Sequence, residues 1–600
     1  MNNSKELSIE DARETSREDF ASLPWLKSKH ALPVLVLVLT GLVYVGTLSF
    51  EFVYDDLGQI VENKFIQSWQ HVPLYFTEHV WHHQSPTVPG NYYRPVFLLW
   101  LLINHTLFGL SPLGWHLTTV MLHLVSTLSV FLIAKKLTKD EAAAGFAALI
   151  FGFHPVHIEA VVWISGVTEP LLAALLLPSF LCFLNSREHR NRNQYLASLG
   201  LFVFALLSKE TAVILPMIVA AYVWIFEGTK QEALQERLKR AIKVALPFFA
   251  LTFIYFVART LALEGFGHAV IKLPFSTILL TWPSILWFYI KLLVWPLGLS
   301  AFYDTPYVTS PGLTNFYLPA IGLVFTAAAL WWASRRSPVI KFATLWLGLP
   351  MLPLLNLSYF IEGEIAHDRY LYLPSVGLAI ILALALRKLN VTKSFLFGQP
   401  AAQVVATLAL ACALATITVT QSQYWASDLL LFYRGVEVAP NNNIAANNLA
   451  NTLFKRGMHE EALGVYHSIL DRQPRFWLSS YNLGYSYYKL GNFEEAERYL
   501  RWSINLNPTE DADQHIYLGL VQMKTNRLEE ATASIRQAIE LRPFGIGYYF
   551  ALGTVLKKQG DLTGALAEFK KEVERNPQQT AAQQEIAEIE ASLSKASDKN

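Results

Sequence analysis

The chain has 600 residues, of which 53% are hydrophobic, 13% aromatic and 16% charged. Typical soluble proteins have roughly 25% charged residues, and one soluble core cannot bury so much apolar surface, so most of this chain is expected to lie in lipid. The 48 basic and 47 acidic residues nearly balance. This balance argues against a nucleic-acid-binding protein, because such proteins have an excess of basic residues. Two cysteines, Cys182 and Cys412, are too few for a disulfide scaffold or a cysteine-based zinc site.

The apolar part of the chain begins after a polar N-terminal stretch. Residues 1–30 are mostly polar and carry both signs of charge, which predicts a cytoplasmic segment. The run from 31 to 50 has about 20 residues, which is enough to cross a bilayer, and no signal-peptide cleavage site follows it. This run is therefore expected to form the first membrane helix.

Ten further apolar runs suit membrane helices. They lie at about 112–134, 142–163, 170–185, 195–208, 211–227, 244–262, 314–333, 339–356, 372–387 and 400–421. The sequence thus predicts a bundle of about eleven membrane helices. Two other apolar stretches, 279–299 and 96–109, are expected to lie at the membrane interface, because the first is rich in tryptophan and tyrosine.

The lysine and arginine residues predict the orientation of this bundle, because short loops rich in them stay in the cytoplasm. Such loops contain Lys135, Lys136 and Lys139; Arg187, Arg190 and Arg192; Lys230, Arg237, Lys239, Arg240 and Lys243; Arg335 and Arg336; and Arg387, Lys388 and Lys393. The intervening loops are then expected on the outer face. An odd number of spans also places the C-terminal region there, in the periplasm of a bacterium or the lumen of the endoplasmic reticulum.

The C-terminal region has a repeat. Prolines recur at spacings of 34, 34, 35 and 34 residues, at Pro440, Pro474, Pro508, Pro543 and Pro577. Glycine and alanine recur in phase with them, which is the pattern of tetratricopeptide (TPR) repeats. The predicted fold is therefore all-α, a polytopic membrane bundle followed by an α-solenoid of about four repeats with a capping helix. The expected domains are 1–30, 31–424, 425–595 and a tail at 596–600.

Asp55 and Asp56 follow the first predicted span directly. Ionisable groups at that depth are usually functional, and two adjacent carboxylates shift each other's pKa, so that one can serve as a general base. A helix N-cap or a solvated loop is the alternative. Arg94 lies in the same outer loop before an apolar helix, where it would either bind phosphate or anchor the chain at the interface.

His154, His157 and Glu159 stand near the outer end of the third predicted span. The H-x-x-H spacing with a nearby carboxylate suggests a zinc-binding site, but no third ligand has suitable spacing. The polar floor of an active site and ordinary buried histidines are the alternatives. The sequence gives no firm prediction of a cofactor, and a divalent metal is left open.

Four more residues stand at outer helix ends. Glu169 is a second candidate acid in a short outer loop. Lys209 and Glu210 interrupt two apolar runs, either as a structural pair or with Lys209 as a phosphate ligand. Arg369, beside Tyr370, opens the tenth predicted span, where a lipid phosphate would lie or where the side chain would simply snorkel.

Several motifs follow one another in a fixed order. After the acidic pair come His-Pro-Val-His-x-Glu at 154–159, Ser-Lys-Glu at 208–210 and Asp-Arg-Tyr-Leu-Tyr-Leu-Pro at 368–374, and the repeats come last. In this combination residues 31–595 resemble the transmembrane-and-tetratricopeptide-repeat (TMTC) protein O-mannosyltransferases and their bacterial relatives, which belong to the GT-C class of glycosyltransferases.

The resemblance implies transfer of a sugar, with mannose as the family's sugar, from a polyprenyl-phosphate donor to hydroxyl groups of a protein acceptor on the outer face. It implies that Asp55 or Asp56 acts at the reaction centre. It places Arg369, and after it Lys209 and Arg94, at the donor phosphate. The repeats would recruit the acceptor, and the histidines receive no role.

Three other functions stay open. A GT-C enzyme could act on a glycan or a lipid instead of a protein. A non-catalytic anchor for a repeat scaffold would need only one or two spans, and a transporter would have ionisable residues near the bilayer midplane. The concentration of ionisable residues at the predicted outer ends favours the enzyme.

Overall fold

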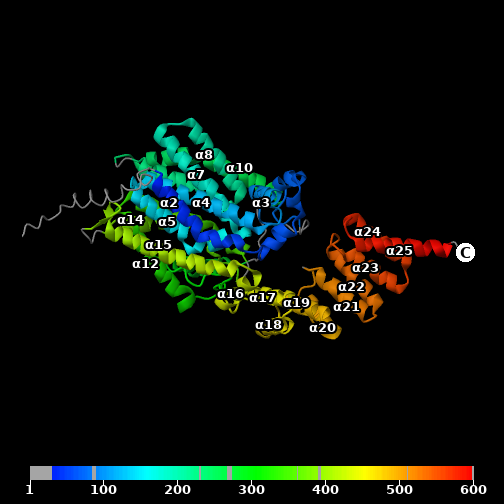
Figure 1. Ribbon diagram of the computed structural model, residues 1–600. Coiled ribbons are helices and arrows are strands. Elements are labelled where there is room, and N and C mark those ends of the chain that lie inside the picture. The colour runs from blue at the N-terminus through cyan, green and yellow to red at the C-terminus, as the bar shows by residue number, and fades with distance from the viewer. Residues whose placement is uncertain are drawn as a thin grey trace, which may run out of the picture. The chain divides into compact units, whose positions relative to one another are not determined.

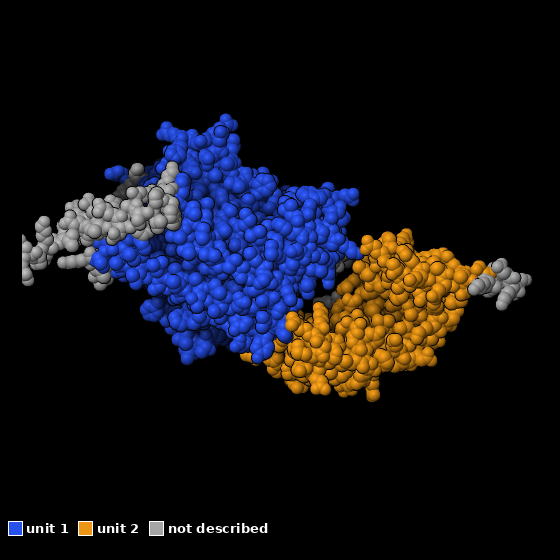
Figure 2. All heavy atoms as spheres, viewed as in Figure 1, with its two compact units in different colours: residues 1–439 blue, residues 440–600 orange. Residues whose placement is uncertain are grey.

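The computed structural model describes residues 30–83, 90–228, 231–265, 273–360, 363–389, 394–509 and 511–597. The predicted N-terminal segment lies outside these residues except for His30, as do residues 598–600 of the predicted tail. Within the described ranges the regular structure is helical (Figure 1), apart from a short hairpin of β1 (Phe395–Leu396) and β2 (Gln399–Pro400). The chain forms two compact units, residues 1–439 and 440–600 (Figure 2).

Among the described residues of the first unit, eight helical segments are long and apolar enough to cross a membrane. They are α2 with η3 (Ala31–Tyr44, Val45–Ser49), α4 (Pro112–Thr138), η8 with α7 (Ile164–Val167, Thr168–His189), α10 (Leu234–Ala262), α11 (Phe275–Val294), η10 with α12 (Leu313–Tyr317, Leu318–Ser334), α13 with η11 (Pro338–Gly348, Leu349–Leu355), and α15 with η14 (Ala401–Ser422, Gln423–Trp425). A ninth would be α5 (Glu141–Phe153) together with η7 (Pro155–His157) and α6 (Ile158–Val162), which are bent by 52°.

The eight segments differ from the predicted eleven spans because three predicted spans form helices of 17 residues or fewer, a fourth is the bent pair, and α11, which was expected at the interface, is among the eight. The three shorter helices are α8 (Arg192–Ser208), η9 with α9 (Glu210–Ile214, Leu215–Phe226) and α14 (Pro374–Leu386). In the apolar run near 372–387 the α-helix starts at Pro374, two residues later than predicted. The short helix η13 (Asp368–Leu371) precedes this run.

The remaining helical segments of the first unit are mostly short. They are η4 (Leu57–Val61), η5 (Lys64–Gln67), η6 (Trp69–Phe76), α3 (Pro95–Phe108), η12 (Leu357–Tyr359) and α16 (Asp428–Val438). The helix α3 has 14 residues, too few to span a bilayer alone. This length agrees with the expectation that residues 96–109 do not cross the membrane.

Ion pairs gather at one end of the bundle. Arg187 and Glu227 lie 2.7 Å apart at the ends of α7 and α9, and Arg387 Nε lies 2.7 Å from Asp140 Oδ2 at the end of α14 and the start of α5. Lys136 of α4 also pairs with Glu188. These contacts place the basic loops together, at the helix ends that the lysine and arginine pattern assigns to the cytoplasm.

The helix α11 is long enough to span, although residues 279–299 were expected at the interface. Contacts tie it to other segments of the first unit. Trp282 donates to the Leu355 carbonyl at 2.8 Å, and the Leu293 carbonyl accepts from His154 Nε2 at 3.1 Å. Thr281 Oγ1 accepts the Val308 N–H at 2.9 Å. Both halves of α11 thus contact the ends of other helices, and its interfacial position stays a prediction.

The second unit consists of four antiparallel helix pairs and a last helix, as the repeat pattern predicts. Its helices are α17 (Asn443–Lys455), α18 (His459–Arg472), α19 (Trp477–Lys489), α20 (Phe493–Leu506), α21 (Asp513–Lys524), α22 (Leu528–Leu541), α23 (Tyr548–Gln559), α24 (Leu562–Arg575) and α25 (Thr580–Ser597). A Cβ at Gly484 would lie 2.8 Å from Leu500 Cγ. The recurring glycine is therefore needed where the two helices of a repeat cross.

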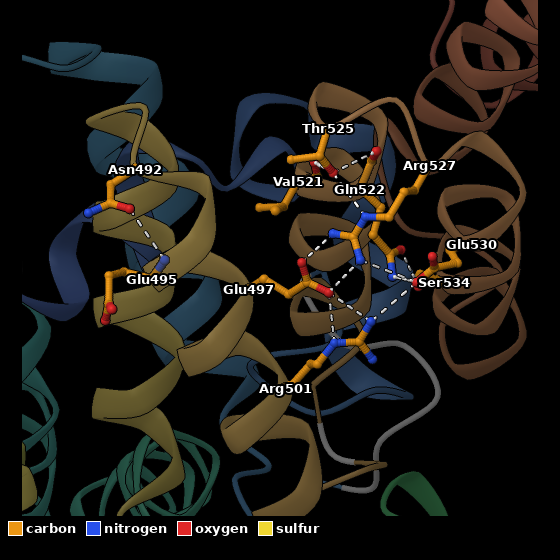
Figure 3. A network of polar contacts seen from close by, with 10 residues as sticks. All are labelled: Asn492, Glu495, Glu497, Arg501, Val521, Gln522, Thr525, Arg527, Glu530 and Ser534. Carbon is orange, nitrogen blue, oxygen red and sulfur yellow. Dashed lines mark hydrogen bonds and ion pairs between the residues drawn. The ribbon is translucent and has the colours of Figure 1, made fainter.

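Polar contacts connect neighbouring repeats of this unit (Figure 3). Glu497 of α20 accepts from Arg501 at 2.8 Å and from Arg527, which precedes α22, at 2.9 Å. Arg501 also lies 3.3 Å from Glu530. Such exposed pairs add little stability singly, but together they fix the position of α22 against α20.

Candidate functional site

A cavity of about 120 Å³ lies where several helix ends of the first unit meet. Its charged lining residues are three cations and one carboxylate, namely Arg94, Lys209, Arg369 and Asp55. The other lining residues are Gln59, Val80, Trp81, Tyr92, Phe97, Trp163, Ser165, Thr168 and Tyr370. The structure thus brings together all three predicted phosphate ligands, one residue of the acidic pair, and Tyr370.

The two adjacent aspartates have different surroundings. Asp56 is fully buried, and its carboxylate accepts the backbone N–H of Ser165 at 2.8 Å, the Ser165 hydroxyl at 2.6 Å and the Val53 N–H at 3.1 Å. Asp55 is half-buried and lines the cavity. Asp56 therefore holds the loop in place, and Asp55 is the carboxylate that a substrate could contact.

Tyr54, which precedes Asp55, is held in an unusual backbone conformation. Its φ of 56° lies in the left-handed region, which is uncommon for a residue with a bulky side chain. Its N–H donates to Asp428 Oδ1 at 2.8 Å. Its ring stacks on Trp163 with centroids 5.7 Å apart and meets the edge of Phe432 at the same distance. These contacts determine where Asp55 points.

The electrostatic surroundings of Asp55 suit a general base. Burial raises the pKa of Asp55 to about 7; the Arg369 guanidinium opposes this increase, and Glu364 adds to it. Burial also raises the pKa of Asp56 to about 7, against the hydrogen bonds from Ser165. A carboxyl group with a pKa near neutrality is effective in proton transfer, and only that of Asp55 lines the cavity.

Each cation of the cavity has a carboxylate partner behind it. Arg94 Nη2 lies 2.9 Å from Glu210 Oε2, and Lys209 Nζ lies 2.5 Å from Glu169 Oε1. Lys209 and Glu210, adjacent in sequence, are therefore not each other's ion-pair partners, and the proposed structural pair is wrong. Burial lowers the pKa of Lys209, and the Glu169 carboxylate partly offsets this effect.

Glu159 holds Arg369 from two directions. Its carboxylate accepts the Arg369 backbone N–H at 2.9 Å and pairs with the Arg369 guanidinium. His367 Nδ1 lies 3.2 Å from the same carboxylate. Because Glu159 is buried and does not line the cavity, it orients Arg369 rather than meeting a substrate.

Aromatic rings flank the cations; Tyr370 is a predicted site residue, whereas Trp163 and Tyr92 are not. The Arg369 guanidinium lies 5.3 Å from the centre of the Trp163 ring and 5.2 Å from that of Tyr370. Arg94 lies 4.5 Å from the centre of the Tyr92 ring. Such cation–π contacts stabilise the positions of both guanidinium groups. The sequence could have indicated these rings, because Tyr92 stands two residues before Arg94 and Trp163 stands two residues before Ser165.

His154 and His157 do not line the cavity. His154 Nε2 donates to the Leu293 carbonyl at 3.1 Å, and His157 Nε2 lies 2.8 Å from Ser375 Oγ. Both are buried in the helix bundle, so they are packing residues rather than the floor of this cavity. Among the described residues, no three His, Cys, Asp or Glu side chains form a group that could hold a metal ion.

Known protein families match both parts of the chain. Residues 93–256 match the family model described as dolichyl-phosphate-mannose-protein mannosyltransferase, a range that includes Arg94 and Lys209 but neither Asp55 nor Arg369. Residues 478–510 and 517–580 match two tetratricopeptide-repeat models.

Known proteins with similar sequences extend the match to most of the chain. The mouse protein O-mannosyl-transferase TMTC3 is 26% identical over 90% of this chain and 64% of its own length, and the human TMTC3 is 26% identical over 89% and 63%. The chain thus spans less than two thirds of these relatives. Among solved structures, a thermophilic TPR protein of Thermus thermophilus covers 28% of the chain and 92% of its own length, with 27% identity and a TM-score of 0.25. Since a mannosyltransferase model and the TMTC proteins match the apolar bundle and repeat models match the C-terminal unit, the chain is an integral membrane protein that is similar to the TMTC protein O-mannosyl-transferases.

Proposed function

We propose that this protein is a membrane glycosyltransferase that transfers mannose from a polyprenyl-phosphate donor to hydroxyl groups of protein acceptors. The matched mannosyltransferase family and the names of the TMTC relatives support the reaction type. The observation that carries the proposal is the cavity that joins Asp55, a carboxyl group with a pKa near 7, to Arg94, Lys209 and Arg369.

In the proposed reaction Asp55 is the general base. It takes the proton of the acceptor hydroxyl while the hydroxyl oxygen attacks the anomeric carbon of the sugar. The bond from that carbon to the phosphate oxygen breaks, and polyprenyl phosphate leaves with the electron pair. The new glycosidic bond and a protonated Asp55 complete the balance.

The three cations stabilise the charge that develops on the leaving phosphate. Their carboxylate partners use Nε and Nη2 of Arg94 and Nη1 of Arg369. The other guanidinium N–H groups and the remaining protons of the Lys209 ammonium group are then available to donate to phosphate oxygens. Because buried Glu159 and Glu169 hold Arg369 and Lys209, these two cations are oriented before the donor binds.

The orientation of the site follows from the charges at the two ends of the bundle. The basic loops meet at the ends of α4, α7 and α14, whereas Arg369 and Lys209 stand at the other ends of α14 and α8. The positive-inside rule assigns the basic ends to the cytoplasm. The cavity then opens at the outer face, where the phosphate of a lipid-linked donor lies, and the repeats offer a surface for a polypeptide acceptor.

The direct test is reconstituted transfer. The purified full chain is mixed with radiolabelled polyprenyl-phosphate mannose and an extracytoplasmic protein acceptor, and label is measured in the protein fraction after organic extraction. We expect transfer that depends on the lipid donor, and none when nucleotide-linked mannose replaces it. Label that appears only in a lipid or an oligosaccharide would contradict a protein acceptor, and no transfer by folded protein to any of these acceptors would contradict the function.

A further inference from the structure

A second, larger cavity of about 720 Å³ lies where α4, α7 and α9 end, among the basic loops. It shares no residue with the candidate site. Its charged lining residues are Lys136, Lys139, Arg187, Arg190, Glu188 and Glu227. With four cations and two carboxylates, the residues that line the cavity have a net charge of two positive charges.

The excess charge can be assigned to particular residues. Arg187 and Glu227 form a bidentate ion pair, with Nε–Oε1 and Nη2–Oε2 distances of 2.9 and 2.7 Å. Lys136 pairs with Glu188. Within the part of the chain that the structure describes, neither Lys139 nor Arg190 has an ion-pair partner closer than 4 Å. Both are exposed. An anion entering the cavity would therefore meet two cations that are not already paired.

The backbone of these two cations gives a second, independent observation. Lys139 directly follows α4 with a φ of 57°, and Arg190 directly follows α7 with a φ of 51°. This left-handed position at a helix C-terminus is usually occupied by glycine, because a Cβ is disfavoured there. Two helices are thus followed by a lysine or an arginine in a backbone conformation that is disfavoured for such residues, and both side chains line the same cavity. Among the described residues, six other than glycine have a positive φ, and two of these six line this cavity; strained backbone of this kind clusters at functional sites.

The position of the cavity indicates the kind of ligand that it could bind. It lies at the ends of two helices, α4 and α7, that can cross the membrane, and its wall also includes Leu137 and Leu184. This is the level of lipid headgroups, where basic pockets between membrane helices bind acidic lipids. We propose that this cavity binds the phosphate of an anionic lipid headgroup through Lys139 and Arg190. A phosphate monoester carries about −1.5 to −2 charges near pH 7 and so matches the two unpaired cations.

Phosphatidic acid, whose headgroup is a phosphate monoester, is the probe for the test. The full chain in detergent is titrated with it, and the retained lipid is measured by native mass spectrometry. In the double variant Lys139→Gly/Arg190→Gly we expect binding to weaken at least about tenfold, because two charge-assisted hydrogen bonds are lost. Glycine suits the left-handed backbone, so the thermal unfolding temperature without lipid should be unchanged or higher. Lys139→Asn/Arg190→Asn, which also tolerates this conformation, should weaken binding equally.

The control is Arg335→Gln/Arg336→Gln, which removes two exposed arginines at the end of α12, outside the cavity. It should bind phosphatidic acid as the wild type does. Equal weakening in the control, unchanged binding in both glycine and asparagine variants, or equal retention of phosphatidylcholine would overturn the proposal. Full competition by inorganic phosphate at the same concentration would overturn a lipid as the source, in favour of a soluble phosphate.

Discussion

The carboxylate of Asp428 accepts a hydrogen bond from the backbone N–H of Tyr54 at 2.8 Å, across 374 positions of sequence. Asp428 is the first residue of α16, which follows the helices of the bundle, and Tyr54 directly precedes Asp55. The direction of the candidate base therefore depends on a residue that no local motif connects to it. Asp428 is a positioning residue, because it does not line the cavity.

This relationship predicts the effect of changing Asp428. Without the acceptor, the left-handed backbone of Tyr54 relaxes and Asp55 moves, and a displacement of about 1 Å can cost about 10²-fold in rate. Asp428→Ala should lower kcat by about 10- to 100-fold with little change in the KM for the donor. Asp428→Asn keeps an acceptor oxygen and should restore most of kcat. An Ala variant with the kcat of the wild type would show that Asp428 does not position the base.

Arg369 is expected to bind the donor phosphate. Lysine cannot reproduce the planar fork of a guanidinium, so Arg369→Lys should lose activity and Arg369→Ala should lose more. A contact made in the ground state would appear as a higher KM for the donor, and one that strengthens as phosphate leaves would appear as a lower kcat. The measurement is specific activity per folded molecule. An Ala variant with unchanged activity would remove Arg369 from the site.

The pH dependence of transfer should follow the ionisation of Asp55. Only the carboxylate can accept a proton, and burial raises the pKa of Asp55 to about 7. The value of kcat/KM should therefore rise with pH and level off above about pH 7, with a tenfold loss per pH unit on the acid side. Glu364 contributes to the raised pKa, so Glu364→Gln should move this acid limb to lower pH. A limb that stays in place, or moves upward, would contradict the assignment.

The buried pair of Lys209 and Glu169 predicts a large effect on stability. Their side chains are 5% and 4% exposed, so Glu169→Gln leaves a buried ammonium group without its counter-charge. Removing one partner of a buried pair typically costs about 3–5 kcal/mol. Glu236→Gln, which breaks the exposed pair with Lys239, should change the free energy of unfolding by less than about 1 kcal/mol. Equal effects in denaturant unfolding would show that burial of the first pair does not matter.

The sequence could predict which residues meet in the cavity because each stands at a helix end. Asp55, Arg94, Lys209 and Arg369 all fall in loops that alternate with the basic ones, and helix ends on one side of a bundle lie close together. The choice between Asp55 and Asp56 could not be predicted. It depends on Ser165, which lies 109 positions away and binds only Asp56.

The ion-pair partners of the cations also could not be predicted from the sequence. Lys209 and Glu210 looked like a pair because they are neighbours in sequence, but an extended backbone at Lys209 turns their side chains toward different helices. The number of spans is approximate, since three predicted spans form helices of 17 residues or fewer, whereas α11, expected at the interface, is long enough to span. Asp428 gave no signal at all, because an acidic residue in the first turn of a helix is ordinary.

The central claim is that Asp55 removes the acceptor proton in sugar transfer. Its most direct test is the specific activity of Asp55→Asn, per folded molecule, with saturating polyprenyl-phosphate mannose and a protein acceptor. Asparagine keeps the shape of the side chain and cannot act as the base, so the account predicts a loss of about 10²- to 10⁴-fold with unchanged expression and thermal unfolding. A folded Asp55→Asn protein that transfers mannose at the wild-type rate would contradict it.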